Sequence, residues 1–286
     1  MTFRSYRGRI APSPTGYLHL GHARTFWTAY QRALENHGTL IFRDEDLDPQ
    51  RSKREYASAM LDDLHWLGIE WQEGPDVGGP HAPYLQSGRR EAYLRNWKLL
   101  VQRGVVYPCT CSRRELSTIA QAPNEGDEEP IYPGKCRPTS VTKLQPVGPQ
   151  GLNWRFRVPD GEAIRFTDGN LGEQSFVAGR DFGDFVVWRR DDVPAYQLAV
   201  VTDDCDMQVT EVVRGEDLLL STARQILILR ALGREIPGYF HCRLVRDTDG
   251  QRLAKRTDAL SLGELRKKGY TPEQIREMWA RFDTSL

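Results

Sequence analysis

The sequence predicts an α/β fold built on a doubly wound parallel sheet. Short apolar strands and amphipathic helices alternate up to Trp66, in the order strand, helix, strand, helix. Each predicted strand leads into a loop rich in polar or turn-forming residues, and sheets of this type bind ligands at the carboxyl ends of their strands. A length of 286 residues leaves room for one large domain with insertions.

The amino-terminal elements follow from the spacing of apolar residues. We expect strands at 7–11 and 39–43 and helices at 21–36 and 52–66, with His37 and Gly38 ending the first helix. The acidic run 44–48 follows the second strand directly. Because the two strands are predicted to be parallel, this run and the loop after Ile10 should face one crevice.

The rest of the chain contains an insertion and a short tail. Expected in order are a helix at 88–103, an irregular segment at 107–149, strands between 154 and 187, a further element from 196, a helix at 221–232, a strand at 239–245, a basic loop at 247–257, and helices at 261–268 and 272–282. The predicted divisions are 1–104 and 196–258 for the two halves of the α/β domain, 105–195 for an inserted subdomain, and 259–286 for a helical tail.

Composition weighs against several classes of protein, although the charge alone does not exclude a nucleic-acid-binding protein. The formal net charge is zero, so the basic excess common in nucleic-acid-binding proteins is missing. No apolar run is long enough to span a bilayer, and the first residues lack the apolar core of a signal peptide. Five cysteines, two of them in Cys109-Thr-Cys111, favour a metal site or free thiols over disulfides. We therefore expect a cytoplasmic protein that binds no membrane.

The loop between the first strand and the first helix has the composition of a phosphate site. Two prolines and a glycine precede His19 and His22, which lie one turn apart near a predicted helix N-terminus, with Gly21 between them. Backbone N–H groups there can approach a phosphate closely, and the imidazoles can add donors. The chain lacks the Gly-rich P-loop and dinucleotide-binding motifs, so a nucleotide site in this loop would be of another kind.

The run Arg9-Ile-Ala-Pro-Ser-Pro-Thr-Gly-x-Leu-His-Leu-Gly-His resembles the HIGH motif of glutamyl-type class I aminoacyl-tRNA synthetases. Further stretches at 42–48, 196–204 and 209–217 match the same family in order, and the resemblance spans about 7–256. It implies a Rossmann-like catalytic domain with an inserted acceptor-type subdomain. It also implies ATP as a substrate with Mg²⁺, and an ATP site that includes Gly21. His19 and His22 would be catalytic and would stabilise charge on the phosphates.

The resemblance implies L-glutamate as the amino acid. Glutamate carries two carboxylates and one ammonium group, so its site needs cationic donors and one anion. Arg9 and Arg214 would hold the carboxylates, in an order that the sequence leaves open, and Glu45 would bind the ammonium group. Ala11, Ser13 and Tyr196 would complete the lining of the site.

A second motif departs from the family pattern. The stretch Arg252-Leu-Ala-Lys-Arg256 corresponds to the Lys-Met-Ser-Lys-Ser loop. Lys255 is the expected catalytic cation as pyrophosphate leaves, and Arg252 would join it in binding ATP. Ala254 replaces the serine, so the loss of a hydroxyl affects the expected movement of the loop more than its chemistry. A basic surface turn is the alternative interpretation.

Three cysteines of the insertion suggest a structural Zn²⁺, which requires four ligands. Cys109, Cys111 and Cys136 supply three thiolates, and Tyr132, Glu115 or water could supply the fourth ligand. The pattern resembles the zinc motif of the glutamyl-queuosine tRNA(Asp) synthetases, which implies Tyr132. Free buried thiols are the alternative, and Cys205 and Cys242 are expected to be ordinary core residues.

About 30 residues follow the second motif, too few for a separate anticodon-binding domain. This matches the glutamyl-queuosine enzymes, truncated paralogues that activate glutamate without tRNA and esterify it to queuosine in the anticodon loop of tRNA(Asp). We therefore expect a monomeric ligase acting on tRNA(Asp) that carries queuosine. Two alternatives remain: a glutamyl-tRNA synthetase core charging tRNA(Glu), and a non-catalytic tRNA-binding paralogue.

Overall fold

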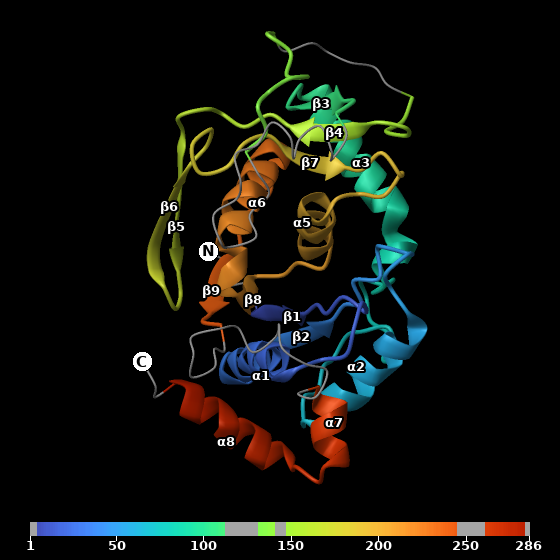
Figure 1. The fold of residues 1–286 in the computed structure, drawn as a ribbon, viewed down its shortest axis with the longest axis vertical. Helices are drawn as coiled ribbons and strands as arrows, with labels where there is room; N and C mark the ends of the chain where they lie inside the picture. The colour runs from blue at the N-terminus through green and yellow to red at the C-terminus, as the bar shows by residue number, and fades with distance from the viewer. Residues whose placement is uncertain (1–4, 112–130, 141–146, 245–260, 284–286) are drawn as a thin grey trace. The chain divides into compact units, whose positions relative to one another are not determined.

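The computed structural model describes residues 5–111, 131–140, 147–244 and 261–283, and the chain forms two compact units (Figure 1). Unit 1 contains Met1–Gly88, Gln208–Leu218 and Pro237–Leu286, and unit 2 contains Arg89–Met207 and Leu219–Ile236. This division follows contacts between residues, whereas the boundaries expected above follow the order of motifs. Those boundaries stay a prediction.

Unit 1 is built on parallel strand pairs. Strand β1 (Arg7–Ile10) pairs in parallel with β2 (Thr39–Phe42), and β8 (Glu211–Gly215) pairs in parallel with β9 (Gly238–Cys242). The N–H of Thr210 donates to the carbonyl of Arg7 at 2.9 Å, so β8 runs along β1. The parallel pairing expected from the alternation of strands and helices is confirmed in this unit.

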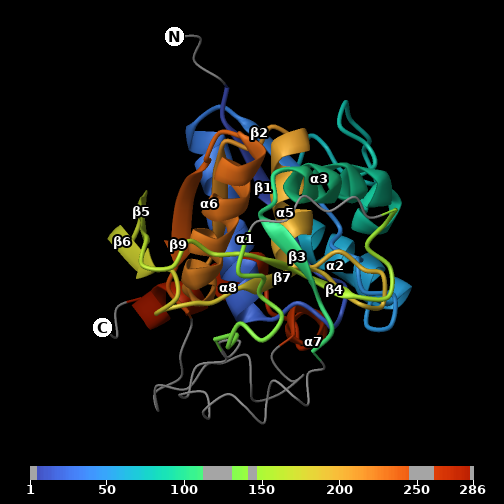
Figure 2. The same ribbon diagram turned by 90° about the horizontal axis from the view of Figure 1, so that it is seen from above.

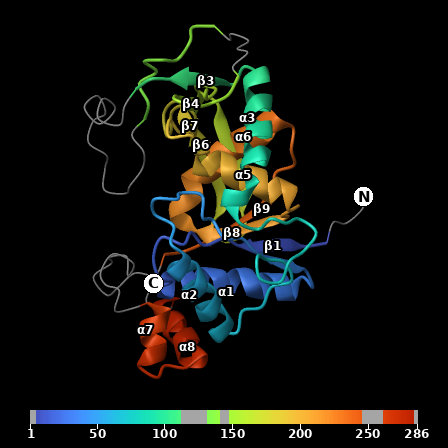
Figure 3. The same ribbon diagram turned by 90° about the vertical axis from the view of Figure 1, so that its right-hand side faces the viewer.

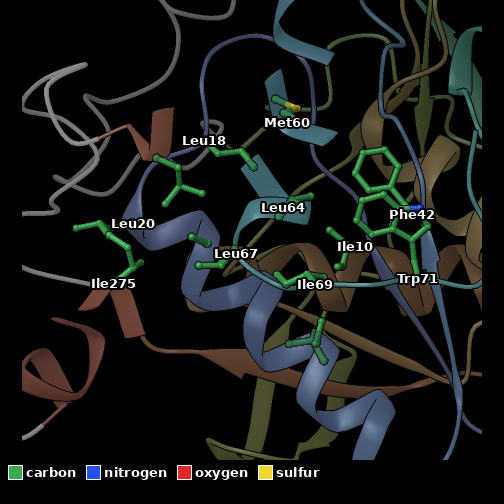
Figure 4. Close-up of a cluster of buried hydrophobic side chains, with 14 of the residues drawn as sticks. Ile10, Leu18, Leu20, Phe42, Met60, Leu64, Leu67, Ile69, Trp71 and Ile275 are labelled. Atoms are coloured by element: carbon green, nitrogen blue, oxygen red, sulfur yellow. The ribbon is translucent and has the colours of Figure 1, made fainter. Parts of the chain in front are cut away.

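The described residues of unit 1 also form four α-helices and a short 3₁₀ turn: α1 (Leu20–Glu35), α2 (Arg54–Trp66), α7 (Leu262–Lys267), α8 (Pro272–Asp283) and η2 (Glu216–Leu218). A second 3₁₀ turn, η1 (Gln86–Arg89), leads from unit 1 into unit 2. The apolar sides of the helices meet in one core, where Ile10, Leu64 and Ile69 are fully buried (Figure 4). Helices α7 and α8 lie beside α2 and α1 (Figure 3). Ile275 of α8 is fully buried in the same core, so the carboxyl-terminal helices are an integral part of unit 1.

In its described residues, unit 2 combines antiparallel strands with three packed helices. Strands β3 (Val106–Cys109), β4 (Asn153–Phe156) and β7 (Phe185–Trp188) form an antiparallel sheet in the order β3-β4-β7. Strands β5 (Ala163–Asp168) and β6 (Gly172–Val177) form a hairpin. Helices α3 (Arg90–Gln102), α5 (Tyr196–Asp206) and α6 (Leu219–Leu232) pack against one another (Figure 2).

The structure corrects part of the expected element list. The segment from residue 107 was expected to be irregular, but Tyr107, Pro108 and Cys109 belong to β3. Pro108 pointed to a loop because proline has no N–H to donate, and β3 tolerates it because it is an edge strand. The element at 196 is a helix, and β9 ends at Cys242, earlier than expected. No helix among the described residues has the length and apolar character needed to cross a bilayer.

Candidate active site

The two histidines of the opening loop form a stacked pair at the start of α1. His19 is the N-cap residue of α1, and its ring lies 3.7 Å from the ring of His22, centroid to centroid, with 26° between their planes. A Cβ added at Gly21 would contact Nδ1 of His19 at 3.5 Å, so the glycine keeps that side of the ring free of side-chain atoms. The His19 side chain makes no capping hydrogen bond, so it does not satisfy the first N–H groups of the helix.

Both imidazoles are held in the neutral form. Burial lowers the pKa of His19. Desolvation of the His22 ring lowers the pKa of His22 as well, and charge repulsion from His19 adds to this shift. His22 nevertheless keeps solvent-exposed surface, so it is open to a ligand. Near pH 7 the pair therefore offers N–H donors from neutral rings.

The acidic run after β2 lies beside this loop, as expected for loops at the carboxyl ends of parallel strands. The N–H of Glu45 donates to the carbonyl of Pro12 at 3.0 Å, and the N–H of Lys53 donates to the carbonyl of Pro14 at 2.9 Å. The carbonyls of Pro12 and Pro14 thus accept hydrogen bonds that attach the segment after β2 to the opening loop. This arrangement brings Ala11 and Ser13 next to the acidic run.

Two buried carboxyl groups of the acidic run differ in their partners. The carboxylate of Glu45 accepts a hydrogen bond from Nη2 of Arg43 at 3.0 Å, and both side chains are buried. In the described part of the chain, Oδ1 of Asp44 is buried and has no hydrogen-bond partner. Burial first, then the charges of Asp46 and Glu45, raise the pKa of Asp44 to about 7. Sequence reasoning missed Arg43, although its spacing of two residues from Glu45 fits one face of a strand end.

The two predicted guanidinium groups are connected through β8. Nη1 of Arg9 donates to the carbonyl of Val213 at 2.7 Å, and Val213 directly precedes Arg214. Both arginines are 5% exposed. The structure therefore brings Arg9 and Arg214 to the same stretch of β8.

Two residues of β9 that sequence reasoning missed hold Arg214. Nε of Arg214 donates to Nε2 of His241 at 3.1 Å, and its guanidinium lies 5.6 Å from the centroid of the Tyr239 ring. This bond requires His241 to carry its proton on Nδ1. His241 stands opposite Arg214 in the parallel register, and the two-residue spacing of Tyr239 and His241 was the available signal.

The segments that flank residues 245–260 both contact the beginning of α1. The carbonyl of Arg243 accepts from Nη1 of Arg24 at 3.3 Å. Ser261 pairs with His19 as an isolated bridge, and the N–H of Leu262 donates to the carbonyl of Leu18 at 2.8 Å. Arg252, Ala254 and Lys255, like Glu115, lie outside the described residues.

The motif around Tyr196 falls in unit 2. Tyr196 begins α5 and is 38% exposed. Asp203 of the same motif is fully buried, and its Oδ1 accepts from Nε of Arg89 at 2.6 Å. The hydroxyl of Tyr93 donates to its Oδ2 at 3.1 Å. Asp203 therefore joins α5 to α3 and the residue before it, which is a structural task.

The cysteines of the insertion gather with Tyr132 into one cluster in unit 2. The three Sγ atoms of Cys109, Cys111 and Cys136 lie within 4.8 Å of one another. The Tyr132 oxygen lies 3.5 Å from Sγ of Cys109 and 3.6 Å from Sγ of Cys111. Sγ of Cys111 and Sγ of Cys136 are 3.6 Å apart, which is too far for a disulfide.

These distances suit a tetrahedral ion. With ordinary zinc bond lengths, neighbouring sulfur ligands would be about 3.8 Å apart and an oxygen would lie about 3.5 Å from each sulfur. The N–H of Cys136 donates to the Tyr132 oxygen at 2.8 Å, so that oxygen already acts as an acceptor. Tyr132, Gly134 and Asp184 also line part of a cavity of about 410 Å³.

The thiols of the cluster differ in acidity. Burial raises the pKa of Cys111. Burial acts in the same direction on Cys136, but hydrogen bonds from Tyr132 and Thr110 outweigh it and lower the pKa of Cys136 to about 6. Cys242 is buried in the core of unit 1 as expected, whereas Cys205, also expected in the core, is only half-buried. Desolvation raises the pKa of Cys205 to about 12.

Comparison with known proteins gives the family of the chain. The family described as "tRNA synthetases class I (E and Q), catalytic domain" matches residues 5–286. The chain belongs to this family of ligases, whose members use ATP.

Individual relatives narrow the comparison. The chain is 49% identical to the Glutamyl-Q tRNA(Asp) synthetase of Symbiobacterium thermophilum and 46% identical to that of Nitratidesulfovibrio vulgaris. Each match covers 94% of this chain and 83% of the relative. A crystal structure of a glutamate tRNA ligase from Elizabethkingia meningosepticum, in complex with its amino acid, matches with 30% identity and a TM-score of 0.75. That match covers 93% of this chain and 54% of the ligase, so the chain spans about half the length of that protein.

Proposed function

We propose that the protein activates L-glutamate with ATP in the absence of tRNA and then transfers the glutamyl group to queuosine in the anticodon loop of tRNA(Asp). The observation that carries the choice of acceptor is the cluster of Tyr132 with three thiols, at distances that suit one tetrahedral ion. A tyrosine in this position is the feature by which the sequence resembles the glutamyl-queuosine enzymes. The two relatives with that name, at 46% and 49% identity, support the same choice.

The first step joins glutamate to AMP. An α-carboxylate oxygen of glutamate attacks the α-phosphorus of ATP, and the bond from that phosphorus to the pyrophosphate oxygen breaks. His19, Gly21 and His22 at the start of α1 would bind the phosphates, with neutral imidazoles as N–H donors. Mg²⁺ would accompany the nucleotide.

Lys255 and Arg252 are proposed to neutralise the departing pyrophosphate. This role rests on the resemblance of their motif to that of the family. It is supported by the flanking residues Arg243 and Ser261, which both contact the first turns of α1.

Glutamate would be held by charge complementarity. Arg9 and Arg214 are buried cations joined to one stretch of β8, and they would bind the two carboxylates. Glu45 would bind the ammonium group, with Arg43 fixing its carboxylate. Ala11, Ser13 and Tyr196 are proposed to line the same site, a role that rests on the family resemblance.

The second step transfers the glutamyl group. A hydroxyl of the queuosine cyclopentene diol attacks the carbonyl carbon of the adenylate, an ester forms, and AMP leaves with the phosphate oxygen. Zn²⁺ bound by Cys109, Cys111, Tyr132 and Cys136 would be structural, since three thiolates make it a weak electrophile. It would fix the end of β3 to the segment that carries Tyr132 and Cys136.

Isotope exchange between pyrophosphate and ATP tests the first step. Purified protein without RNA should catalyse exchange that depends on glutamate, and glutamine should not replace it. Exchange that appears only after tRNA is added would favour an ordinary glutamyl-tRNA synthetase core. No exchange under either condition would favour a non-catalytic paralogue.

A further inference from the structure

Arg155 of β4 is one of the most deeply buried charged side chains in unit 2, with 2% of its surface exposed. Nε donates to Sγ of Cys109 at 3.4 Å. Its guanidinium carbon lies 4.0 Å from the centroid of the Tyr132 ring. The side chain thus contacts two of the four residues proposed to bind zinc.

The position of the guanidinium is fixed from the opposite side. Nη1 of Arg155 donates to the carbonyl of Asp184 at 2.9 Å. The Asp184 carboxylate in turn accepts from the hydroxyl of Tyr107 at 2.5 Å and from the N–H of Val158 at 2.8 Å. Arg155 is therefore held between Asp184, the residue before β7, and the cysteine cluster, with little freedom to move away from either.

Charge explains why a buried guanidinium should stand here. Zn²⁺ with three thiolates and a phenolate would carry about two net negative charges, and buried charge is costly unless it is paired. Arg137, which directly follows Cys136, is held by other groups: Nη1 donates to the Asp160 carboxylate and Nη2 to the carbonyl of Val158, both at 2.6 Å, and Nε lies 3.4 Å from the Asp184 carboxylate. Lys135 is exposed. Arg155 is the buried cation that touches the thiol and the ring directly.

We propose that Arg155 is a positioning residue of the zinc site, on the assumption that the proposed zinc site exists. Its Nε–H···Sγ bond orients the Cys109 thiolate and offsets part of the negative charge of the site. Its guanidinium plane, lying over the Tyr132 ring, keeps the phenol oxygen directed at the sulfurs. A purely structural Arg155, serving only the Asp184 carbonyl, would leave the affinity for zinc unchanged.

The test compares Arg155→Met and Arg155→Lys with Arg157→Met. Arg157 follows β4, two residues beyond Arg155, and none of the hydrogen bonds found among the described residues joins its guanidinium to the cysteines, so it controls for loss of one arginine. Zinc content and the rate of zinc release to a chelator are measured for each protein. Loss of an outer partner of a metal ligand costs about 10- to 100-fold in affinity, so Arg155→Met should release zinc faster by a similar factor. Arg155→Lys should fall between this variant and the wild type, and Arg157→Met should match the wild type.

Cobalt substitution gives a readout independent of activity. Loss of the hydrogen bond to Cys109 should increase electron donation by the thiolate and shift the sulfur-to-cobalt absorption bands of Arg155→Met to lower energy. Unchanged zinc release and unchanged bands in this variant would overturn the role of Arg155. If Arg155→Met does not fold, a wild-type rate of zinc release from Arg155→Lys would overturn the role of Arg155 equally. A wild-type protein that binds no zinc would instead refute the zinc site, and the role of Arg155 would fall with it.

Discussion

Substitution of Asp203 by asparagine tests whether the motif that begins at Tyr196 stabilises the fold or takes part in the reaction. Asp203 is fully buried, and its carboxylate bonds Nε of Arg89 at 2.6 Å and the hydroxyl of Tyr93 at 3.1 Å. Removing one charge of a buried ion pair typically costs about 3–5 kcal/mol because the other charge stays buried. Asparagine keeps the shape, and Arg89 keeps its bond to Asp206 at 2.9 Å, so we expect the lower limit, about 3 kcal/mol.

Urea unfolding followed by tryptophan fluorescence measures this loss, because Trp97 and Trp188 are fully buried in the same unit. Asp206→Asn is the matched control. It removes the same charge from a carboxylate that also pairs with Arg89 but is 33% exposed, and such a pair contributes about 1 kcal/mol or less. Below the unfolding transition, Asp203→Asn should retain the wild-type kcat for pyrophosphate exchange. Equal costs for the two variants would refute the structural role, as would lost exchange in a stable Asp203→Asn protein.

Three further predictions concern individual groups. The pKa of Asp44 is raised to about 7, so the folded state binds more protons than the unfolded state and stability falls as pH rises from about 4 to about 7. Relative to wild type, Asp44→Asn should therefore gain on the order of 2 kcal/mol in free energy of unfolding between pH 5 and pH 8, and an equal difference at both pH values would contradict this. His241→Leu removes the acceptor for Nε of Arg214, so it should raise the KM for glutamate about tenfold or more with little change in kcat. His241→Gln should retain most of the affinity for glutamate. Equal KM values in the two variants would count against the role of this hydrogen bond. Tyr132→Phe should lose zinc to a chelator faster than the wild type but more slowly than Cys136→Ser, as measured by metal analysis after dialysis, and wild-type zinc retention in Tyr132→Phe would remove Tyr132 from the ligand set.

The helices and strands of unit 1 were predictable from the sequence because their apolar residues either recur at helical spacing or form continuous short runs. In α1 the buried residues recur at helical spacing, with Leu20 and Ala23 three positions apart and Ala29 and Ala33 four positions apart, and β1 and β2 are short apolar runs. Helix α5 gave no such pattern because every residue from Leu198 to Asp204 is buried, so its apolar and polar positions follow no helical period.

The sequence was enough to predict which residues belong to the candidate site, but not which side chains they pair with through hydrogen bonds and ion pairs. The sequence indicated that Glu45 and Arg214 should meet a substrate, and the loops bearing Ala11 and Ser13 do lie beside the acidic run. The pairing of Arg43 with Glu45 is local, and only its spacing of two residues signals it. The pairing of His241 with Arg214 depends on the parallel register of β8 and β9, which is set by contacts distant in sequence. The role of Arg155 could not be predicted for the same reason: β3, the strand that pairs with β4 and carries Cys109, was not predicted from the sequence.

Transfer of labelled glutamate to defined tRNAs tests the proposed function most directly. The protein is incubated with ATP, Mg²⁺ and labelled glutamate, together with tRNA(Asp) that carries queuosine, tRNA(Asp) that lacks it, or tRNA(Glu). The proposal predicts label on tRNA(Asp) only when queuosine is present, and none on tRNA(Glu). Label on the terminal adenosine of tRNA(Glu), with none on queuosine-containing tRNA(Asp), would contradict it.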